Sequence, residues 1–282
     1  MADRDLTDRT YVVTGANTGI GKETVRGLAA RGARVVLAAR SAEKTNPVID
    51  ELKKATGNDR LELLVLDLGE LASVRRAAAE LLARDLPIHG LINNAGLAGP
   101  RGVTKDGFEL AFGTNHLGHF LWTRLLLDRV RASGPARIVN VSSASHYQAK
   151  GIDWEALRRP TRSTTGMSEY AVSKLCNVLF TRELARRVPA SEVTCYSLHP
   201  GVIASDIWQR RVPRFLAAIP KLFMKSTAEG AKTSLYCATS PDCASHSGRF
   251  YTDSKEKRPS RLADDDALAA ELWKRSEAWT QA

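Results

Sequence analysis

Cysteine motifs, long apolar runs and clustered basic residues are all missing from this chain of 282 residues. Its four cysteines form no Cys-x-x-Cys pair, and no histidine lies at metal-ligand spacing from them. This pattern argues against a structural zinc site and favours a reducing, cytoplasmic setting. The first residues form no apolar signal segment, and no run reaches the ~18 apolar residues of a membrane span. We therefore expect no metal, no transmembrane anchor and a cytoplasmic location.

The net charge of +10 raises the question of nucleic-acid binding. However, the basic residues are scattered, and no Lys/Arg run is interleaved with aromatic side chains that could stack on bases. A solvated basic surface explains the charge better, so no nucleic-acid partner is expected.

Strand-like and helix-like segments alternate along the chain without a break. The strand-like segments are β-branched or apolar runs near 10–14, 32–40, 61–66, 88–92, 137–142, 193–198 and 249–251. The segments between them have helical spacing, apart from a polar insertion at 144–168 that is long enough to suggest function or mobility. This alternation predicts an α/β fold with one Rossmann-type, doubly wound parallel sheet of about seven strands and helices on both faces. No repeat, linker or low-complexity segment is found, so we expect one domain over 1–282.

A glycine-rich turn, Gly15-Ala-Asn-Thr-Gly19-Ile-Gly21, lies between the first strand and the first helix. Backbone N–H groups and a helix N-terminus in this arrangement can hold a pyrophosphate. The alternative is a tight turn without a ligand.

At the end of the second strand, an acidic residue would favour NAD, whereas Ala39 and Arg40 stand there. Because Arg suits a 2′-phosphate, this position favours NADP over an Arg that is merely exposed.

Tyr170 and Lys174 are four residues apart at the start of an apolar run with helical spacing. A neighbouring ammonium favours the phenolate, so the pair can exchange a proton near neutral pH. Tyr251-Thr-Asp-Ser-Lys255 repeats the Tyr-x-x-Ser-Lys pattern, but Lys255 is followed by a polar stretch that Pro259 interrupts. We therefore interpret the first copy as the functional one and the second as part of a solvated loop.

Several motifs together resemble the classical short-chain dehydrogenases/reductases. They are Thr14-Gly15-x-x-x-Gly19-Ile-Gly21, Asn93-Asn94-Ala95-Gly96, Asn115, Ser143, Tyr170-x-x-x-Lys174 and Pro200-Gly201. The stretches Asn-His-Leu-Gly-His-Phe-Leu, Arg-Ile-Val-Asn-Val-Ser-Ser and Ser-Gly-Arg-Phe-Tyr make the retinol dehydrogenase-like group the closest resemblance. Two departures stand out. Many membrane-bound members carry an N-terminal anchor, whereas the first predicted strand here begins at about residue 10. The Ser143–Tyr170 gap is about twice the usual one, although such an insertion is familiar in that group.

The resemblance implies roles for individual residues. Tyr170 would exchange the proton, Lys174 would lower the pKa of Tyr170 and hold the nicotinamide ribose, Ser143 would orient the substrate oxygen, and Asn115 would hold a relay water. Ser142 is the alternative to Ser143. The implied NADP(H)-binding residues are Gly15, Asn17, Thr18, Gly19, Ile20, Gly21, Arg40, Asp67, Leu68, Asn94, Ala95, Gly96, Tyr170, Lys174, Pro200, Gly201, Ile203 and Ser205.

The sequence thus predicts an NADP(H)-dependent oxidoreductase that transfers a hydride between nicotinamide and the alcohol or carbonyl group of a small apolar substrate. The alternatives are a non-catalytic NADP-sensing or scaffold protein on the same fold, and a basic protein that binds a membrane or nucleic-acid surface. Segment 202–225, apolar between basic flanks, is expected to cover the substrate. It could instead be a helix pair on the core or a peripheral membrane contact. The oligomeric state stays open.

Overall fold

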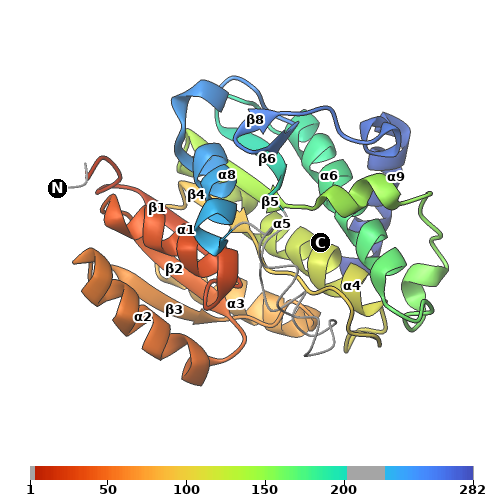
Figure 1. Cartoon of the computed structure of the whole chain (residues 1–282), viewed down its shortest axis with the longest axis horizontal. Coiled ribbons are helices and arrows are strands. Elements are labelled where there is room, and N and C mark those ends of the chain that lie inside the picture. Colours follow the sequence, from red (N-terminus) through yellow and green to blue (C-terminus); the bar gives the residue numbers. More distant parts are fainter. Residues whose placement is uncertain (1–3, 202–225, 282) are drawn as a thin grey trace.

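The computed structural model describes residues 4–201 and 226–281. Eight strands form one sheet in the order β3-β2-β1-β4-β5-β6-β7-β8 (Figure 1). Neighbouring strands are parallel from β3 to β7, and β8 pairs antiparallel with β7. The strands are β1 (Thr10–Thr14), β2 (Arg34–Ala39), β3 (Leu61–Val65), β4 (Gly90–Asn93), β5 (Ala136–Val141), β6 (Val193–His199), β7 (Arg249–Thr252) and β8 (Lys255–Glu256).

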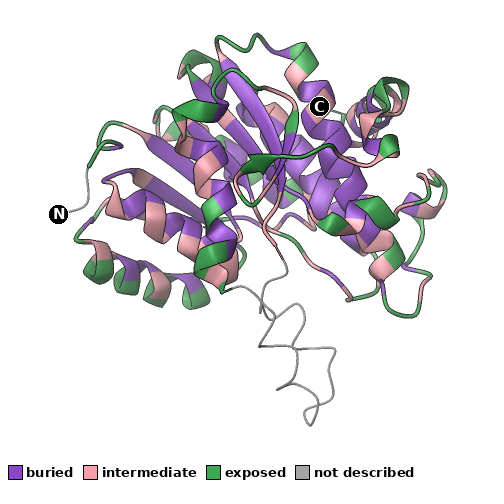
Figure 2. Ribbon diagram, turned by 45° about the horizontal axis from the view of Figure 1, so that its top comes forward, coloured by how far each residue is buried: buried purple, intermediate pink, exposed green. Residues whose placement is uncertain are grey.

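Helices cover both faces of the sheet. Those in the described ranges are α1 (Gly19–Ala30), α2 (Ala42–Thr56), α3 (Leu71–Ala83), α4 (Leu110–Phe112), α5 (Gly118–Ala132), α6 (Met167–Arg187), α8 (Thr227–Thr239) and α9 (Asp266–Thr280). One core joins α1, α2 and α8 to the sheet, and a second joins α3, α5 and α6 to its other face. Figure 2 shows the resulting pattern, with buried strands between helices whose outer faces are exposed.

The central strands form because their side chains are buried on both faces. All five residues of β1 are buried, as parallel strands between two helix layers require. The neighbours of β1 are β2 on one side and β4 on the other, so the direction of strand order reverses there. In doubly wound sheets, ligands bind outside the carboxyl ends of the strands at this reversal. The turns that follow β1, β2, β4 and β5 therefore define where the site lies.

The predicted α/β fold is confirmed, with eight strands rather than about seven. The additional strand is β8, which lies where the sequence predicted a solvated loop. Its two residues, Lys255 and Glu256, are exposed and charged, so no apolar alternation revealed it. Asp253 and Ser254 turn the chain back with positive φ angles of 53° and 58°, which places β8 beside β7.

The insertion at 144–168 packs on the body of the protein. It contains two short 3₁₀ helices, Ala144–Gln148 and Ala156–Arg158. Leu157 joins the apolar core that α4, α6 and α9 share, and its carbonyl accepts a hydrogen bond from the backbone N–H of Glu109. The buried Thr161 hydroxyl donates to the Glu109 carboxylate. These contacts attach the insertion to the segment that precedes α4.

Two further properties concern the described ranges. Within them, no helix combines the length and apolar character that crossing a membrane requires. Nor do three or more His, Cys, Asp or Glu side chains gather there in a way that could hold a metal ion.

Candidate active site

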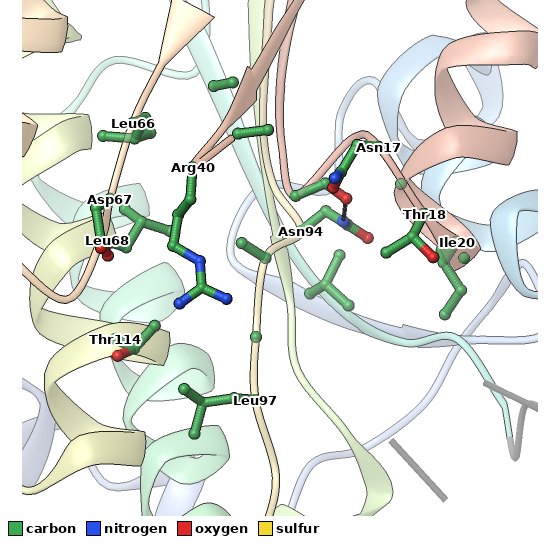
Figure 3. A pocket seen from close by; sticks show the side chains of 18 of the residues that line it. Asn17, Thr18, Ile20, Arg40, Leu66, Asp67, Leu68, Asn94, Leu97 and Thr114 are labelled. Carbon is green, nitrogen blue, oxygen red and sulfur yellow. Dashed lines mark hydrogen bonds between the residues drawn. The ribbon is translucent and has the colours of Figure 1, made fainter. Parts of the chain in front are cut away.

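A long pocket of about 680 Å³ lies at the carboxyl ends of the central strands (Figure 3). One end is formed by the glycine turn after β1 and by the residues that follow β2 and β3. The other end is formed by Tyr170 and Lys174 of α6, together with Pro200 after β6. The pocket therefore joins the candidate phosphate-binding turn to the candidate proton-transfer pair.

The glycine turn has the close contacts that a phosphate-binding turn needs. Gly15 has a φ of +63°, a conformation that glycine adopts without steric cost. A Cβ atom on Gly21 would lie 2.3 Å from the Gly15 carbonyl oxygen and 2.5 Å from Asn94 Nδ2. Asn94 Nδ2 donates to the carbonyls of Thr14 and Gly15, at 2.9 and 3.3 Å. The turn after β4 thus supports the turn after β1 and holds the N-terminus of α1 open to the pocket.

At the same end of the pocket as the glycine turn, the residues that follow β2 include two cations. Arg40 follows β2, and its guanidinium extends into the pocket in Figure 3. Lys44 in the first turn of α2 lines the same end, and Ser41 caps that helix by accepting from the Lys44 backbone N–H at 3.3 Å. Asp67 is the carboxylate among the pocket-lining residues, and its Oδ1 accepts from the Gly69 backbone N–H at 2.9 Å. This end is therefore suited to an anionic group.

Lys174 is a buried amine held against the sheet. Its side chain is 3% exposed, and Nζ donates to the carbonyl oxygen of Val141, the last residue of β5, at 2.8 Å. Removal from water lowers the pKa of Lys174 from 10.5 to about 8. Nζ lies 5.6 Å from the centre of the Tyr170 ring, one helical turn earlier. The pair is thus close enough for the charge on Lys174 to influence the phenol.

Asn115 lies in a π-helical turn, Gly113–Leu117, between α4 and α5. Its side chain is fully buried. Oδ1 accepts from the Leu97 backbone N–H, and Nδ2 donates to the Leu97 carbonyl and to Ser173 Oγ, each at 2.9 Å. The Ser173 hydroxyl donates in turn to the Tyr170 carbonyl at 2.8 Å. Asn115 therefore connects the loop after β4 to the start of α6.

Ser142 and Ser143 have different surroundings after β5. The buried Ser142 hydroxyl donates to the Lys174 carbonyl at 2.7 Å, which ties β5 to α6. Ser143 is half-buried, and its oxygen accepts from the Ser145 backbone N–H at 3.1 Å while its hydroxyl lies 3.2 Å from Ser145 Oγ. The Ser142 hydroxyl has a structural partner, whereas the hydroxyl of Ser143 contacts another side chain that can rotate away.

The second Tyr-x-x-Ser-Lys copy has no helical geometry. Tyr251 pairs with Glu256 across the β7–β8 hairpin, and Thr252 pairs with Lys255. The Tyr251 ring is 2% exposed and packs against Tyr196 and Tyr236. Burial raises the pKa of Tyr251, which is the opposite of what proton exchange needs. Tyr251 is not among the residues that line the pocket.

Most of the residues predicted from sequence meet in this pocket. Those that line it are Gly15, Asn17, Thr18, Gly19, Ile20, Gly21, Arg40, Asp67, Leu68, Asn94, Ala95, Gly96, Tyr170, Lys174 and Pro200. Three other predicted residues do not line the pocket but directly follow a residue that does: Asn115, Ser143 and Gly201. Ile203, Ser205 and the substrate-covering segment 202–225 lie outside the described residues.

Other lining residues were not singled out from the sequence. They are Ala38, Ser41, Lys44, Leu66, Leu97, Thr114 and Val141. Ala39 and Ser142 also line the pocket, and the sequence had pointed to both, the first for cofactor choice and the second as the alternative to Ser143. Several of them stand at or just after a strand end, so the rule that ligands bind at the carboxyl ends of strands could have found them. Lys44 could have been found as a basic residue in the first turn of the helix after β2. Thr114 had no such signal.

The pocket fits a nicotinamide dinucleotide. The glycine turn leaves no room for a Cβ atom at Gly21, and the N-terminus of α1 faces a cavity of about 680 Å³. Three cations, Arg40, Lys44 and Lys174, and one carboxylate line it, which suits a ligand with several phosphate charges. The nicotinamide end would lie beside Tyr170 and Lys174.

Comparison with known proteins identifies the family. A family profile described as short chain dehydrogenase matches residues 9–154. The chain is 45% identical to Retinol dehydrogenase 12 of Mus musculus over 269 residues, which are 94% of this chain and 84% of that protein. A crystal structure of an uncharacterised protein from Mycobacterium paratuberculosis matches with a TM-score of 0.77 at 34% identity, over 99% of this chain and 96% of that chain.

A second solved structure, the NADP active-site complex of RhlG from Pseudomonas aeruginosa, matches with a TM-score of 0.69 at 25% identity, over 89% of this chain and 96% of that chain. The sequence relative and the two solved structures thus each match at least 89% of this chain. The family match and the 45% identity show that this chain belongs to the short-chain dehydrogenase family, within its retinol dehydrogenase-like group.

Proposed function

We propose that this oxidoreductase uses NADP(H) and transfers a hydride between its nicotinamide and the alcohol or carbonyl group of an apolar substrate. The observation that carries the proposal is a single pocket with a pair of basic residues at one end and a Tyr–Lys pair at the other. Arg40 and Lys44 stand where a cofactor phosphate would bind, and Tyr170 and Lys174 stand where a proton would be exchanged. Because one pocket holds both pairs, a single extended dinucleotide could reach from one to the other.

The preference for NADP over NAD rests on the end of β2. NAD-specific sites place a carboxylate there to accept from the ribose 2′-hydroxyl, and a carboxylate would repel a 2′-phosphate. Here Ala39 ends the strand and Arg40 follows, with Lys44 one turn into α2. No ion pair joins Arg40 to a carboxylate within the described ranges, so its charge is available to a ligand.

The bound cofactor supplies the hydride chemistry, and the protein moves the proton. The Tyr170 hydroxyl would give its proton to the developing alkoxide in reduction and take it back in oxidation. Lys174, held by Val141, favours the phenolate and so brings the proton affinity of Tyr170 toward the working pH. The Ser143 hydroxyl would orient the substrate oxygen, because the Ser142 hydroxyl is already committed to the Lys174 carbonyl.

An apolar substrate is favoured by the relatives. Retinol dehydrogenases of mouse and human, at 43–45% identity, are named for a long apolar alcohol. The substrate of this chain is proposed to be of the same kind, such as a retinoid, a steroid ketone or an aliphatic aldehyde.

Cofactor binding tests the proposal directly. Fluorescence titration should give a Kd for NADPH at least tenfold below the Kd for NADH, since a charge-assisted contact to phosphate is worth roughly 1.5–3 kcal/mol. Arg40→Leu should remove most of the difference, and Lys44→Met part of it. Lys53→Met, a change further along α2 outside the pocket, is the matched control and should leave both affinities unchanged. Equal wild-type affinities for the two cofactors would contradict the NADP assignment.

A further inference from the structure

His119 makes two hydrogen bonds from the interior of the protein. Its Nδ1 lies 3.0 Å from the backbone carbonyl oxygen of Asn115, one helical turn earlier. Its Nε2 lies 2.8 Å from Oγ1 of Thr14, the last residue of β1. Both His119 and Thr14 are buried. The imidazole therefore bridges the end of β1 and the π-helical turn that carries Asn115.

The partners of Thr14 determine which ring nitrogen carries the proton. Thr14 Oγ1 accepts from the backbone N–H groups of Asn94 and Ala95, each at 3.0 Å. A hydroxyl has two acceptor lone pairs and one hydrogen, so the Thr14 hydrogen remains for His119 Nε2. Nε2 then accepts, and the proton of the neutral ring resides on Nδ1. Nδ1–H donates to the Asn115 carbonyl.

The surroundings of His119 keep the ring neutral. Burial lowers its pKa from 6.5 to about 4, although the hydrogen bond to Asn115 acts in the other direction. The titratable groups that face it are Lys174, whose charge also lowers the pKa, and His116, which is itself neutral because burial lowers its pKa to about 3. The single tautomer thus persists across the pH range in which the enzyme would work.

We propose that His119 is a positioning residue, which fixes the backbone carbonyl of Asn115 relative to the cofactor-binding turns that follow β1 and β4. The Asn115 side chain cannot do this alone, because its three hydrogen bonds connect it to Leu97 and Ser173. The backbone of Asn115 is tied to Thr14, Asn94 and Ala95 through the imidazole. This role deepens the proposed function, on which it rests, because it couples the cofactor pocket to the proton-transfer end.

Two substitutions separate the two hydrogen bonds. In His119→Asn, the side-chain amide reaches the position of Nδ1 and keeps a donor for the Asn115 carbonyl. In His119→Gln, the amide reaches the position of Nε2, which keeps a partner for Thr14 and removes the donor to Asn115. His116→Gln is the matched control, because His116 is buried on the same turn but contacts Ser276 of α9, at 3.1 Å.

Steady-state kinetics with NADPH then distinguish positioning from general stability. We expect His119→Gln to lose about tenfold or more in kcat, the effect of one lost hydrogen bond of roughly 1.4 kcal/mol, with the NADPH Kd changed less than threefold. His119→Asn should keep most of kcat, and His116→Gln should lower Tm but leave kcat within twofold. Equal kcat losses in the two His119 variants, or no loss in His119→Gln, would overturn the proposal.

The ring tautomer supplies a readout that needs neither turnover nor a variant. Nitrogen-15 NMR of the wild-type protein with labelled histidine should show His119 as the Nδ1–H tautomer, unchanged from pH 8 to pH 5.5. An Nε2–H tautomer would leave the Asn115 carbonyl without this donor and would overturn the inference whatever the activity. If the wild type turned over no aldehyde or ketone, the proposed function would fail, and the tautomer would decide the positioning role by itself.

Discussion

Replacing Lys174 by Met should make the protein more stable and inactive at the same time. The pKa of Lys174 in the folded protein is about 8, against 10.5 in water, because the amine is buried. At pH 7 the amine is protonated in both states, so the folded protein bears the cost of burying the charge. A difference of this size corresponds to roughly 3 kcal/mol. Met fills a similar volume without a charge.

Part of that gain is lost with the hydrogen bond to Val141. A typical intramolecular hydrogen bond contributes about 1 kcal/mol. However, the Val141 carbonyl also accepts from Asn177 Nδ2 at 3.3 Å, so it keeps a buried partner in the variant. The net stabilisation is therefore about 2 kcal/mol, equivalent to a rise in Tm of roughly 4 °C for a chain of this size. Activity should fall by at least ~10²-fold, the usual contribution of proton transfer.

Thermal denaturation without cofactor measures this effect, with Lys232→Met as the control because Lys232 is exposed on α8. The pH dependence has a defined sign. Between pH 8 and 10.5 the unfolded wild type binds more protons than the folded form, so its stability rises with pH and the advantage of Lys174→Met narrows. A variant less stable than wild type at pH 7, relative to this control, would refute the reasoning.

Three further predictions follow from the same geometry. Tyr170→Phe should lower kcat at least ~10²-fold and leave the NADPH Kd unchanged, whereas Tyr251→Phe should change kcat only a few-fold. Steady-state kinetics that showed comparable kcat losses in the two variants would reject the assignment of Tyr170. Ala39→Asp combined with Arg40→Leu should weaken NADPH and improve NADH, by about tenfold or more in the ratio of kcat/KM, and an unchanged ratio would place the 2′-phosphate elsewhere. The free energy of unfolding should fall as pH drops from 6.5 towards 4, by roughly 3 kcal/mol from His119, whose pKa is about 4 against 6.5 unfolded. Urea titrations of His119→Asn should show a smaller fall.

The features that sequence predicted well depend on local pattern. Gly15, Gly19 and Gly21 stand between a β-branched strand and an amphipathic helix, so the turn follows from the flanking periodicities. Tyr170 and Lys174 share a helix face because the apolar run after them has helical spacing. The alternation of such segments gives the parallel sheet. The resemblance to short-chain dehydrogenases then specifies the family.

The features that sequence did not predict depend on contacts between distant segments. No residue pattern in the sequence predicts the π-helical turn at Gly113–Leu117, because the residues around Asn115 are typical of an ordinary α-helix. β8 forms because the chain turns at Asp253 and Ser254, and its charged residues have no strand pattern. Ser142 and Ser143 are adjacent and of one type, and only their surroundings in the fold, above all the hydrogen bond from Ser142 to the Lys174 carbonyl, distinguish them.

The central claim is that one pocket binds NADP(H) and reduces an apolar carbonyl compound. The most direct measurement is the rate of NADPH and of NADH oxidation by the wild-type protein over retinal, steroid ketones, quinones and aliphatic aldehydes. We expect turnover of at least one of these classes, with kcat/KM for NADPH at least about tenfold above that for NADH. Equal values for the two cofactors, or no oxidation of either with any of these compounds, would contradict the account.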